Sequence, residues 1–183
     1  TGSGAGIGRA TVSLLAERGA AVAVVDINPA TAEATARELA ERGLRAIALP
    51  VDVTESDSIA AMVQRVEAAL GPIELLVNNA GLGTAVPALK ETPEQFRSVV
   101  DVNLNGAFWA AKECAAVMGP GSSIVNVASV LGLTAGFAPQ AAYSATKAAV
   151  MGLTRDLASQ WGGRRGIRVN SLAPGYFASE MTD

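Results

Sequence analysis

The chain alternates short apolar runs with longer amphipathic stretches, and this alternation constrains the fold more than any other feature. Apolar runs of strand length are typical of a parallel sheet that is buried on both faces, and the stretches between them have helical length and periodicity. We expect strands over residues 20–25, 45–49, 73–77, 123–128 and 167–172. We expect helices over residues 9–18, 29–41, 56–70, 93 to about 117, and 142 to about 160. The pattern therefore predicts an α/β fold with a doubly wound parallel sheet in a three-layer α/β/α arrangement.

The composition fits one globular domain over residues 1–183. Half of the residues are hydrophobic, which is enough for a sizeable core. The net charge is −3 and basic residues are scattered, so we expect no nucleic-acid partner, and we expect the pair Arg164-Arg165 to lie in a surface turn. No apolar run reaches the roughly eighteen residues that a membrane span needs, so we expect no membrane partner. Cys114 is the only cysteine, which excludes an internal disulfide and favours a cytoplasmic location.

The sequence contains no histidine, and this restricts the chemistry that an enzyme with this chain could perform. A zinc site of the usual His/Cys kind is excluded, and we expect no metal. A Ser-His-Asp triad and a histidine acid/base are excluded as well. If the protein is an enzyme, some other group must move the proton.

Glycines at positions 2, 4, 6 and 8 form a loop immediately before the first expected helix. Glycine allows a tight turn and a close approach to a diphosphate, and the following helix presents its free N–H groups and its positive end. The literal G-x-G-x-x-G pattern is not present, and the loop alone is weak support. Such a loop needs a strand before it, and none precedes Thr1, so we expect a fragment. An unusually compact intact protein is the alternative.

Asp26 strengthens the dinucleotide hypothesis because it stands 18 residues after Gly8, at the end of the next expected strand. A carboxylate there can accept hydrogen bonds from both ribose hydroxyls of an adenosine, and it would repel a 2′-phosphate. No Arg or Lys stands at Ser3, Gly4, Ala5 or Ile27 to attract such a phosphate. NAD is therefore expected over NADP. The alternative for Asp26 is a loop cap for the helix that starts at Pro29.

Seven short motifs in order resemble the short-chain dehydrogenase/reductase family, and together they cover essentially the whole chain. They are TGSGAGIG (1–8), Asp52-Val53, NNAG (78–81), VNLNG (102–106), IVNVAS (124–129), YSATK (143–147) and APGYFASEM (173–181). The resemblance implies a Rossmann-type NAD-binding catalytic domain that lacks the family's first strand and C-terminal substrate lid. It implies cofactor contacts from Gly2, Ser3, Gly6, Ile7, Gly8, Asp26, Ile27, Asp52, Val53, Asn79, Ala80, Gly81, Tyr143, Lys147, Pro174, Gly175, Phe177 and Ser179.

The same resemblance implies a catalytic group made of Ser129, Tyr143, Lys147 and Asn103. A tyrosine can serve as the acid/base if its pKa, about 10 in water, is brought down toward neutrality. Lys147 lies one helical turn after Tyr143, so its ammonium group, together with a positive oxidised nicotinamide, can favour the tyrosinate. Ser129 can hydrogen-bond the substrate oxygen. Asn103 resembles the residue that holds a relay water near Lys147, although it could instead brace a helix turn.

The sequence therefore predicts an oxidoreductase that transfers a hydride between NAD(H) and a secondary alcohol or ketone. An NADPH-dependent 3-oxoacyl-carrier-protein reductase and a catalytically idle NAD-binding regulatory protein are the alternatives. The loops at residues 82–89 and 131–140 are expected to build much of the substrate pocket. Apolar residues spread around most of the helix that starts at residue 142, and together with the family resemblance this predicts a homodimer or homotetramer.

Overall fold

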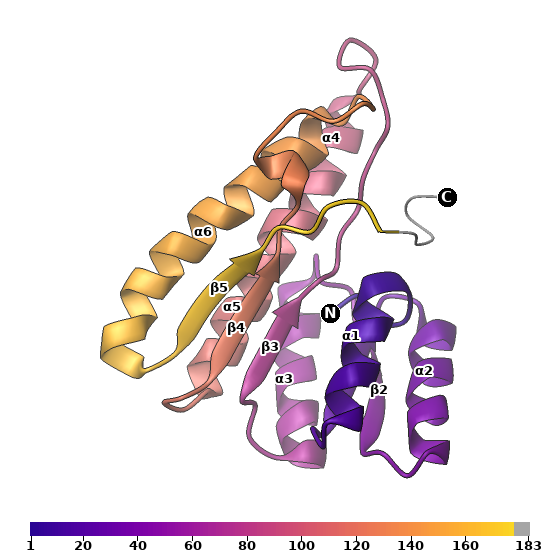
Figure 1. Cartoon of the computed structure of the whole chain (residues 1–183), viewed down its shortest axis with the longest axis vertical. Helices are drawn as coiled ribbons and strands as arrows, with labels where there is room; N and C mark the ends of the chain where they lie inside the picture. Colours follow the sequence, from indigo (N-terminus) through magenta and orange to yellow (C-terminus); the bar gives the residue numbers. More distant parts are fainter. Residues whose placement is uncertain (178–183) are drawn as a thin grey trace.

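The computed structural model describes residues 1–177, and these form helices and parallel strands in alternation (Figure 1). The strands are β1 Val22–Asp26, β2 Ala46–Pro50, β3 Leu75–Asn78, β4 Ser123–Val127 and β5 Arg168–Leu172. The helices are α1 Gly6–Glu17, α2 Pro29–Glu41, α3 Ser56–Leu70, α4 Pro93–Val100, α5 Gly106–Val117 and α6 Ala141–Arg165. The α/β class is confirmed, and α2 and α3 have the predicted bounds.

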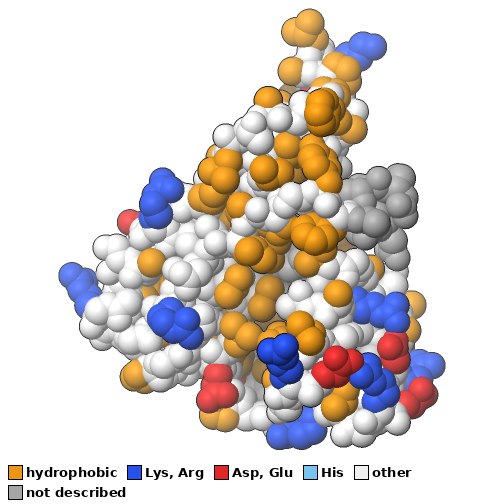
Figure 2. Space-filling model, viewed as in Figure 1, with side chains coloured by type: hydrophobic (Ala, Val, Ile, Leu, Met, Phe, Trp, Pro, Cys, Tyr) orange, Lys and Arg blue, Asp and Glu red, His pale blue; other side chains and the backbone are white. Residues whose placement is uncertain are grey.

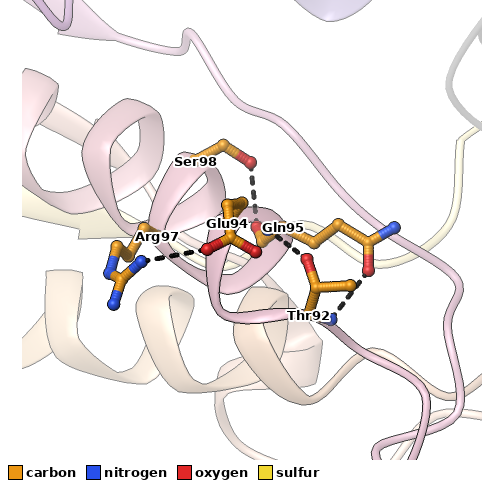
Figure 3. A network of polar contacts seen from close by, with 5 residues as sticks. All are labelled: Thr92, Glu94, Gln95, Arg97 and Ser98. Carbon is orange, nitrogen blue, oxygen red and sulfur yellow. Dashed lines mark hydrogen bonds and ion pairs between the residues drawn. The ribbon is translucent and has the colours of Figure 1, made fainter.

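Two helices, α2 and α4, begin at side-chain caps that the local sequence provides. The side chain of Asn28 accepts hydrogen bonds from the backbone N–H groups of Ala30 and Thr31, and Pro29 is the first residue of α2. At α4, Thr92 and Gln95 form a reciprocal capping box, which Figure 3 shows together with the ion pair between Glu94 and Arg97. These caps satisfy backbone donors that the first turn of a helix leaves unpaired, and they fix where each helix begins.

Three expected helix boundaries differ from the structure. The first helix begins at Gly6 instead of residue 9, because glycines 6 and 8 belong to its first turn. The expected long helix from Pro93 is interrupted by a π-helical segment, Asp101–Asn105, between α4 and α5. The last helix continues to Arg165 and ends at Gly166 in the left-handed conformation, so the pair Arg164-Arg165 lies in its final turn and not in a surface turn. Basic side chains at a helix C-terminus interact favourably with its dipole.

The five strands are all parallel, but they form two sheets. One sheet pairs β1 with β2, and the other has the order β3-β4-β5. Strands β1 and β3 are not hydrogen-bonded to each other, and an apolar cleft of about 500 Å³ lies between them. The cleft therefore separates the two groups of hydrogen-bonded strands. Residues at the start of the chain join its two halves: the N-terminal amine of Thr1 donates to the carbonyl of Val77, and the N–H of Ser3 donates to that of Val25.

Helices cover the two faces of the strands unequally. Helices α3, α5 and α6 pack on one face of both sheets, around a core that includes Ile59, Ile124 and Leu157. Helices α1 and α2 pack on the opposite face of β1 and β2, where Val24 and Leu39 are fully buried. The complete three-layer arrangement is therefore limited to β1 and β2 in the described part of the chain. Figure 2 shows hydrophobic side chains gathered over the middle of the molecule, where β3, β4 and β5 lie in Figure 1.

None of the helices within residues 1–177 has the combination of length and apolar character that crossing a bilayer requires.

Candidate active site

A pocket of about 810 Å³ lies at the carboxyl ends of the strands, and most of the predicted site residues line it. Parallel α/β sheets present ligand-binding side chains at this edge because every strand ends there. Its lining includes the predicted residues Gly2, Gly6, Ile7, Asp26, Ile27, Asp52, Val53, Asn79, Ala80, Gly81, Ser129, Tyr143, Lys147, Pro174, Gly175 and Phe177. The glycine loop and the Ser-Tyr-Lys group therefore share one continuous pocket.

The glycine loop has a conformation that only glycine adopts without strain. Gly2 has a φ of 59°, and a Cβ there would lie 2.7 Å from the Cα of Ala80. A Cβ at Gly8 would lie 2.0 Å from the carbonyl oxygen of Gly2. Helix α1 begins directly after this loop, and Ala5 at its N-cap provides no side-chain cap. Free N–H groups and the positive end of α1 therefore face the pocket, and such an arrangement suits an anionic diphosphate.

The Asn79 side chain holds the glycine loop against the end of β3. Its amide donates to the carbonyl of Gly2 at 2.8 Å and to that of Thr1 at 3.3 Å. The hydroxyl of Thr1 in turn accepts from the N–H groups of Asn79 and Ala80. The predicted cofactor residue Asn79 therefore shapes the loop with its side chain while it lines the pocket.

Asp26 ends β1, and its carboxylate binds two backbone N–H groups. One oxygen accepts from Gly4 at 2.9 Å, and the other accepts from Asn28 at 3.0 Å. The interaction with Asn28 corresponds to the alternative interpretation of Asp26 as a cap of the following loop. Asp26 also lines the pocket, so it can serve both purposes.

Ser3 and Gly8 do not line this pocket and border the cleft between β1 and β3 instead. The hydroxyl of Ser3 donates to the carbonyl of Val25 and accepts from its N–H group, so it fastens the loop to β1. Gly8 permits the close contact between α1 and Gly2. Cofactor contacts from these two residues stay predictions. The predicted contact from Ser179 lies outside the described residues.

The catalytic candidates come from two elements. Ser129 follows β4, is buried, and accepts a hydrogen bond from the N–H of Leu131 at 3.1 Å. Tyr143 and Lys147 lie in the first turns of α6, and the Lys147 ammonium nitrogen is 5.5 Å from the centre of the Tyr143 ring. Lys147 is buried and donates to the carbonyl of Val127 at 2.8 Å. The structure therefore brings together the end of β4 and the start of α6, as the motifs predict.

The protein by itself does not lower the pKa of Tyr143. Burial raises this pKa above its usual value, a hydrogen bond with the Ser129 side chain acts in the opposite direction, and the nearby Tyr176 raises it further. Burial also lowers the pKa of Lys147 to about 8. Removal from water disfavours the charged form of both groups, and the expectation that Lys147 favours the tyrosinate together with an oxidised nicotinamide stays a prediction.

Asn103 does not line the pocket, and its side chain acts as a brace. Its amide bonds both backbone groups of Leu82 and donates to the hydroxyl of Thr146 at 3.1 Å. It lies in the π-helical segment, a feature that often marks functional sites. A Cβ at Gly81 would lie 3.5 Å from the Lys147 nitrogen and 3.6 Å from the Asn103 oxygen, so both groups border the same small space. The relay role of Asn103 stays a prediction.

Sequence reasoning did not single out several polar residues that the structure makes important. Asn126 is fully buried in β4, where it accepts from Asn78 of β3 and donates to Thr154 of α6. The signal was an asparagine inside an otherwise apolar strand, since a buried amide must find partners. Tyr176 also lines the pocket. It stands between two residues that the motif did select, Gly175 and Phe177.

Comparisons with known proteins show the family to which the chain belongs. The short chain dehydrogenase family model matches residues 1–183. A cis-4-hydroxycyclohexanecarboxylate dehydrogenase of Sinomonas cyclohexanicum is 42% identical over 179 residues, which cover 96% of this chain and 71% of that protein. A 3-oxoacyl-[acyl-carrier-protein] reductase of Staphylococcus aureus is 37% identical over 186 residues, and the match covers 100% of this chain and 75% of that protein. An uncharacterised short-chain type dehydrogenase/reductase of Sinorhizobium fredii is 40% identical over 182 residues. This match covers 99% of this chain and 32% of that longer protein.

Among solved structures, a gluconate 5-dehydrogenase from Burkholderia cenocepacia in complex with NADP and tartrate is similar with a TM-score of 0.92 and 39% identity. The match covers 100% of this chain and 71% of that one. Fold and site together are those of NAD(P)-dependent oxidoreductases that act on CH–OH groups. Within that class, the chain belongs to the short-chain dehydrogenase family.

Proposed function

We propose that the protein transfers a hydride between NAD(H) and a secondary alcohol or ketone, with Tyr143 as the acid/base. The observation that carries this proposal is the single pocket that Tyr143, Lys147 and Ser129 share with the glycine loop and Asp26. One end of this pocket suits a dinucleotide, and the other end provides a group for the proton. A bound nicotinamide would supply the hydride chemistry that no side chain can supply.

Each residue has a distinct role in this proposal. Gly2, Gly6 and the start of α1 bind the diphosphate, and Asp26 accepts hydrogen bonds from the adenosine ribose. Ser129 donates to the substrate oxygen, on which negative charge develops during reduction. Tyr143 gives its proton to that oxygen in the reductive direction and takes it back in the oxidative direction.

The pKa of Tyr143 requires a positive charge beyond what the buried lysine provides. Burial raises this pKa in the protein by itself, and Lys147 is 5.5 Å from the tyrosine ring centre. An oxidised nicotinamide next to the ring adds a second positive charge and favours the tyrosinate. We therefore infer that the tyrosine becomes an effective base only when oxidised cofactor is bound.

The choice of NAD(H) over NADP(H) rests on Asp26. A 2′-phosphate next to this carboxylate would be repelled, and Lys147 is the only basic residue among the described residues that line the pocket. The gluconate 5-dehydrogenase named above binds NADP, which keeps the alternative with NADPH open. The second enzymatic candidate is a 3-oxoacyl-carrier-protein reductase, which the Staphylococcus aureus relative supports and which is expected to use NADPH.

A catalytically idle NAD-binding regulatory protein is the candidate from another class. Such a protein has no use for Ser129, Tyr143 and Lys147 in one pocket, so the site favours the enzyme. We also propose a cytoplasmic location, because the single cysteine, Cys114, is buried and forms no disulfide. The proposed assembly is a homodimer or homotetramer. For the enzyme itself we propose a small-molecule alcohol or ketone as substrate, and no nucleic-acid or membrane partner.

The substitution Tyr143→Phe tests the proposal because it removes only the phenol oxygen. We expect turnover of a panel of ketones to fall about 100-fold or more, which is the usual contribution of a positioned acid/base. Binding of NADH, followed by its fluorescence, should be retained because the ring remains in place. Equal turnover by wild type and variant would contradict the mechanism, and a wild type that binds NADH without turning over any substrate would favour the idle protein.

A further inference from the structure

The substrate end of the pocket contains two polar side chains that the proposed chemistry does not use. Beyond Ser129 and Tyr143, its wall is made of apolar or small residues, together with Gln140 and Tyr176. The apolar or small members are Leu82, Gly83, Ala85 and Leu131. Polar groups in a mostly apolar pocket commonly fix the orientation and identity of a ligand.

Gln140 has an amide that is available to a ligand. The residue is half-buried, precedes the first residue of α6, and lies three positions before Tyr143, which is close to one helical turn. Its backbone carbonyl accepts from Ser144, but its side chain neither caps α6 nor makes a hydrogen bond with any of residues 1–177. An amide carries two donors and one acceptor oxygen, so it can pair with a hydroxyl or a carbonyl.

Tyr176 adds a second phenol to the pocket that contains Tyr143. The backbone just before it is fixed because the N–H of Val130 donates to the carbonyl of Pro174 at 2.9 Å. Its hydroxyl oxygen lies 3.2 Å from where a Cβ on Gly136 would be, which places it against the 131–140 loop. It also acts electrostatically on Tyr143, in the direction that raises the pKa of Tyr143. Gln140 and Tyr176 therefore reach the pocket that contains Ser129 and Tyr143 from different segments of the chain.

The charges around the pocket restrict what these groups can bind. Among the described lining residues, the only cation is Lys147, which is buried and already donates to Val127. The carboxylates are Asp26, which ends β1, and Asp52, which follows β2, whereas Gln140 and Tyr176 belong to the half of the molecule built on β4 and β5. Among residues 1–177, an anionic substrate would find no unpaired cation at this end of the pocket, and a cationic one would find no carboxylate.

We propose that Gln140 and the Tyr176 hydroxyl form a polar subsite for an uncharged oxygen on the carbon next to the reacting one. This inference rests on the proposed function and narrows its substrate class to neutral vicinal diols and α-hydroxyketones. The amide of Gln140 and the phenol of Tyr176 hydrogen-bond the second oxygen, while Ser129 and Tyr143 bind the oxygen that is oxidised or reduced. The subsite selects the substrate and takes no part in proton transfer.

The test compares 2,3-butanediol with 2-butanol, which share a carbon skeleton and differ by the second hydroxyl. Initial rates of NADH formation by the full chain give the ratio of kcat/KM for the diol over that for the simple alcohol. We expect the wild type to favour the diol, and Gln140→Leu and Tyr176→Phe each to lower the ratio about 5- to 10-fold, as for a lost neutral hydrogen bond. Gln64→Leu, on the exposed surface of α3, is the matched control and should keep the wild-type ratio.

The ratio is measured within one protein, so a general loss of folded enzyme cancels from it. A wild type that does not favour the diol, or a ratio that stays unchanged in both Gln140→Leu and Tyr176→Phe, would overturn the subsite while leaving the oxidoreductase proposal intact. A wild type that oxidises neither alcohol and reduces neither matching ketone, with NAD(H) or NADP(H), would overturn the proposed function and the subsite with it.

Discussion

The side chain of Asn103 forms two hydrogen bonds with the backbone of Leu82, accepting from its N–H at 2.7 Å and donating to its carbonyl at 2.9 Å. Asn103 belongs to the π-helical segment between α4 and α5, and Leu82 follows the Asn-Asn-Ala-Gly motif at the end of β3. The pairing resembles that of two strands, although one partner is a side chain. It fixes the loop that lines the pocket next to Gly81.

Replacement of Asn103 by Leu should loosen this loop. The variant loses its hydrogen bonds to Leu82 and Thr146 and leaves their groups without these partners, so we expect a loss of about 1–3 kcal/mol in the free energy of unfolding. Urea titration followed by circular dichroism measures this loss, and turnover should fall as well. Asn105→Leu, which removes only a hydrogen bond to Asp101, is the control; equal stability of the two variants would contradict the bracing role.

Replacement of Asp26 by Ala should relax the preference for NAD. The carboxylate no longer repels a 2′-phosphate, so the ratio of kcat/KM with NADP to that with NAD should rise about 10-fold or more. Loss of the bonds from Gly4 and Asn28 should also lower stability by about 1–2 kcal/mol. Steady-state rates with both cofactors measure the ratio, with Asp57→Ala on α3 as a control. A wild type that uses NADPH faster than NADH would show the cofactor assignment to be wrong.

The contribution of Lys147 to stability should rise between about pH 8 and pH 10.5. Its pKa is lowered from 10.5 to about 8 in the folded protein, so over this range the unfolded chain binds more protons than the folded one. Stability increases with pH under that condition, and the cost of the buried charge is greatest below pH 8. Burial raises the pKa of Cys114 from 9.0 to about 12, which has the opposite effect from pH 9 upward.

The variant Lys147→Met isolates the lysine contribution because Cys114 is the same in both proteins. We expect the wild type to gain stability relative to the variant as the pH rises from 8 to 10.5, so that the unfolding free energy of the wild type minus that of the variant increases. Denaturant titrations at several pH values measure it. A difference that does not change with pH would mean that the lysine keeps its ordinary pKa in the folded protein.

A self-association surface is expected on α4 and α6. The residues of α6 that are buried within the chain lie along one stripe, which includes Ala142, Val150 and Leu157. Ala148 of α6 and Phe96 of α4 are exposed. Light scattering after size exclusion should give a dimer or tetramer, and Phe96→Arg should weaken it. The control Leu14→Arg, at an exposed position of α1, should not. A monomer at every concentration would contradict the prediction.

Local signals were sufficient where a short segment determines its own structure. Asn28-Pro29 and the Thr92–Gln95 capping box set helix starts, and glycines 2 and 8 occupy positions where a Cβ would clash. The sequence pattern did not predict local structure that depends on a contact with a residue distant in the chain. The π-helical segment within the expected long helix accompanies the contact of Asn103 with Leu82, 21 residues earlier, and no periodicity within residues 93–117 encodes that contact.

The sequence by itself predicted the α/β class and the parallel order of elements, because periodicity and glycine placement are local properties, and its resemblance to the short-chain dehydrogenase family implied the Ser129, Tyr143 and Lys147 group. Only the tertiary structure decided that Ser3 fastens a loop and that Asn103 braces Leu82. It also decided that burial raises the pKa of Tyr143 and that Gln140 and Tyr176 share a pocket. Burial and contact depend on which segments fold against one another, and a linear pattern does not contain that information.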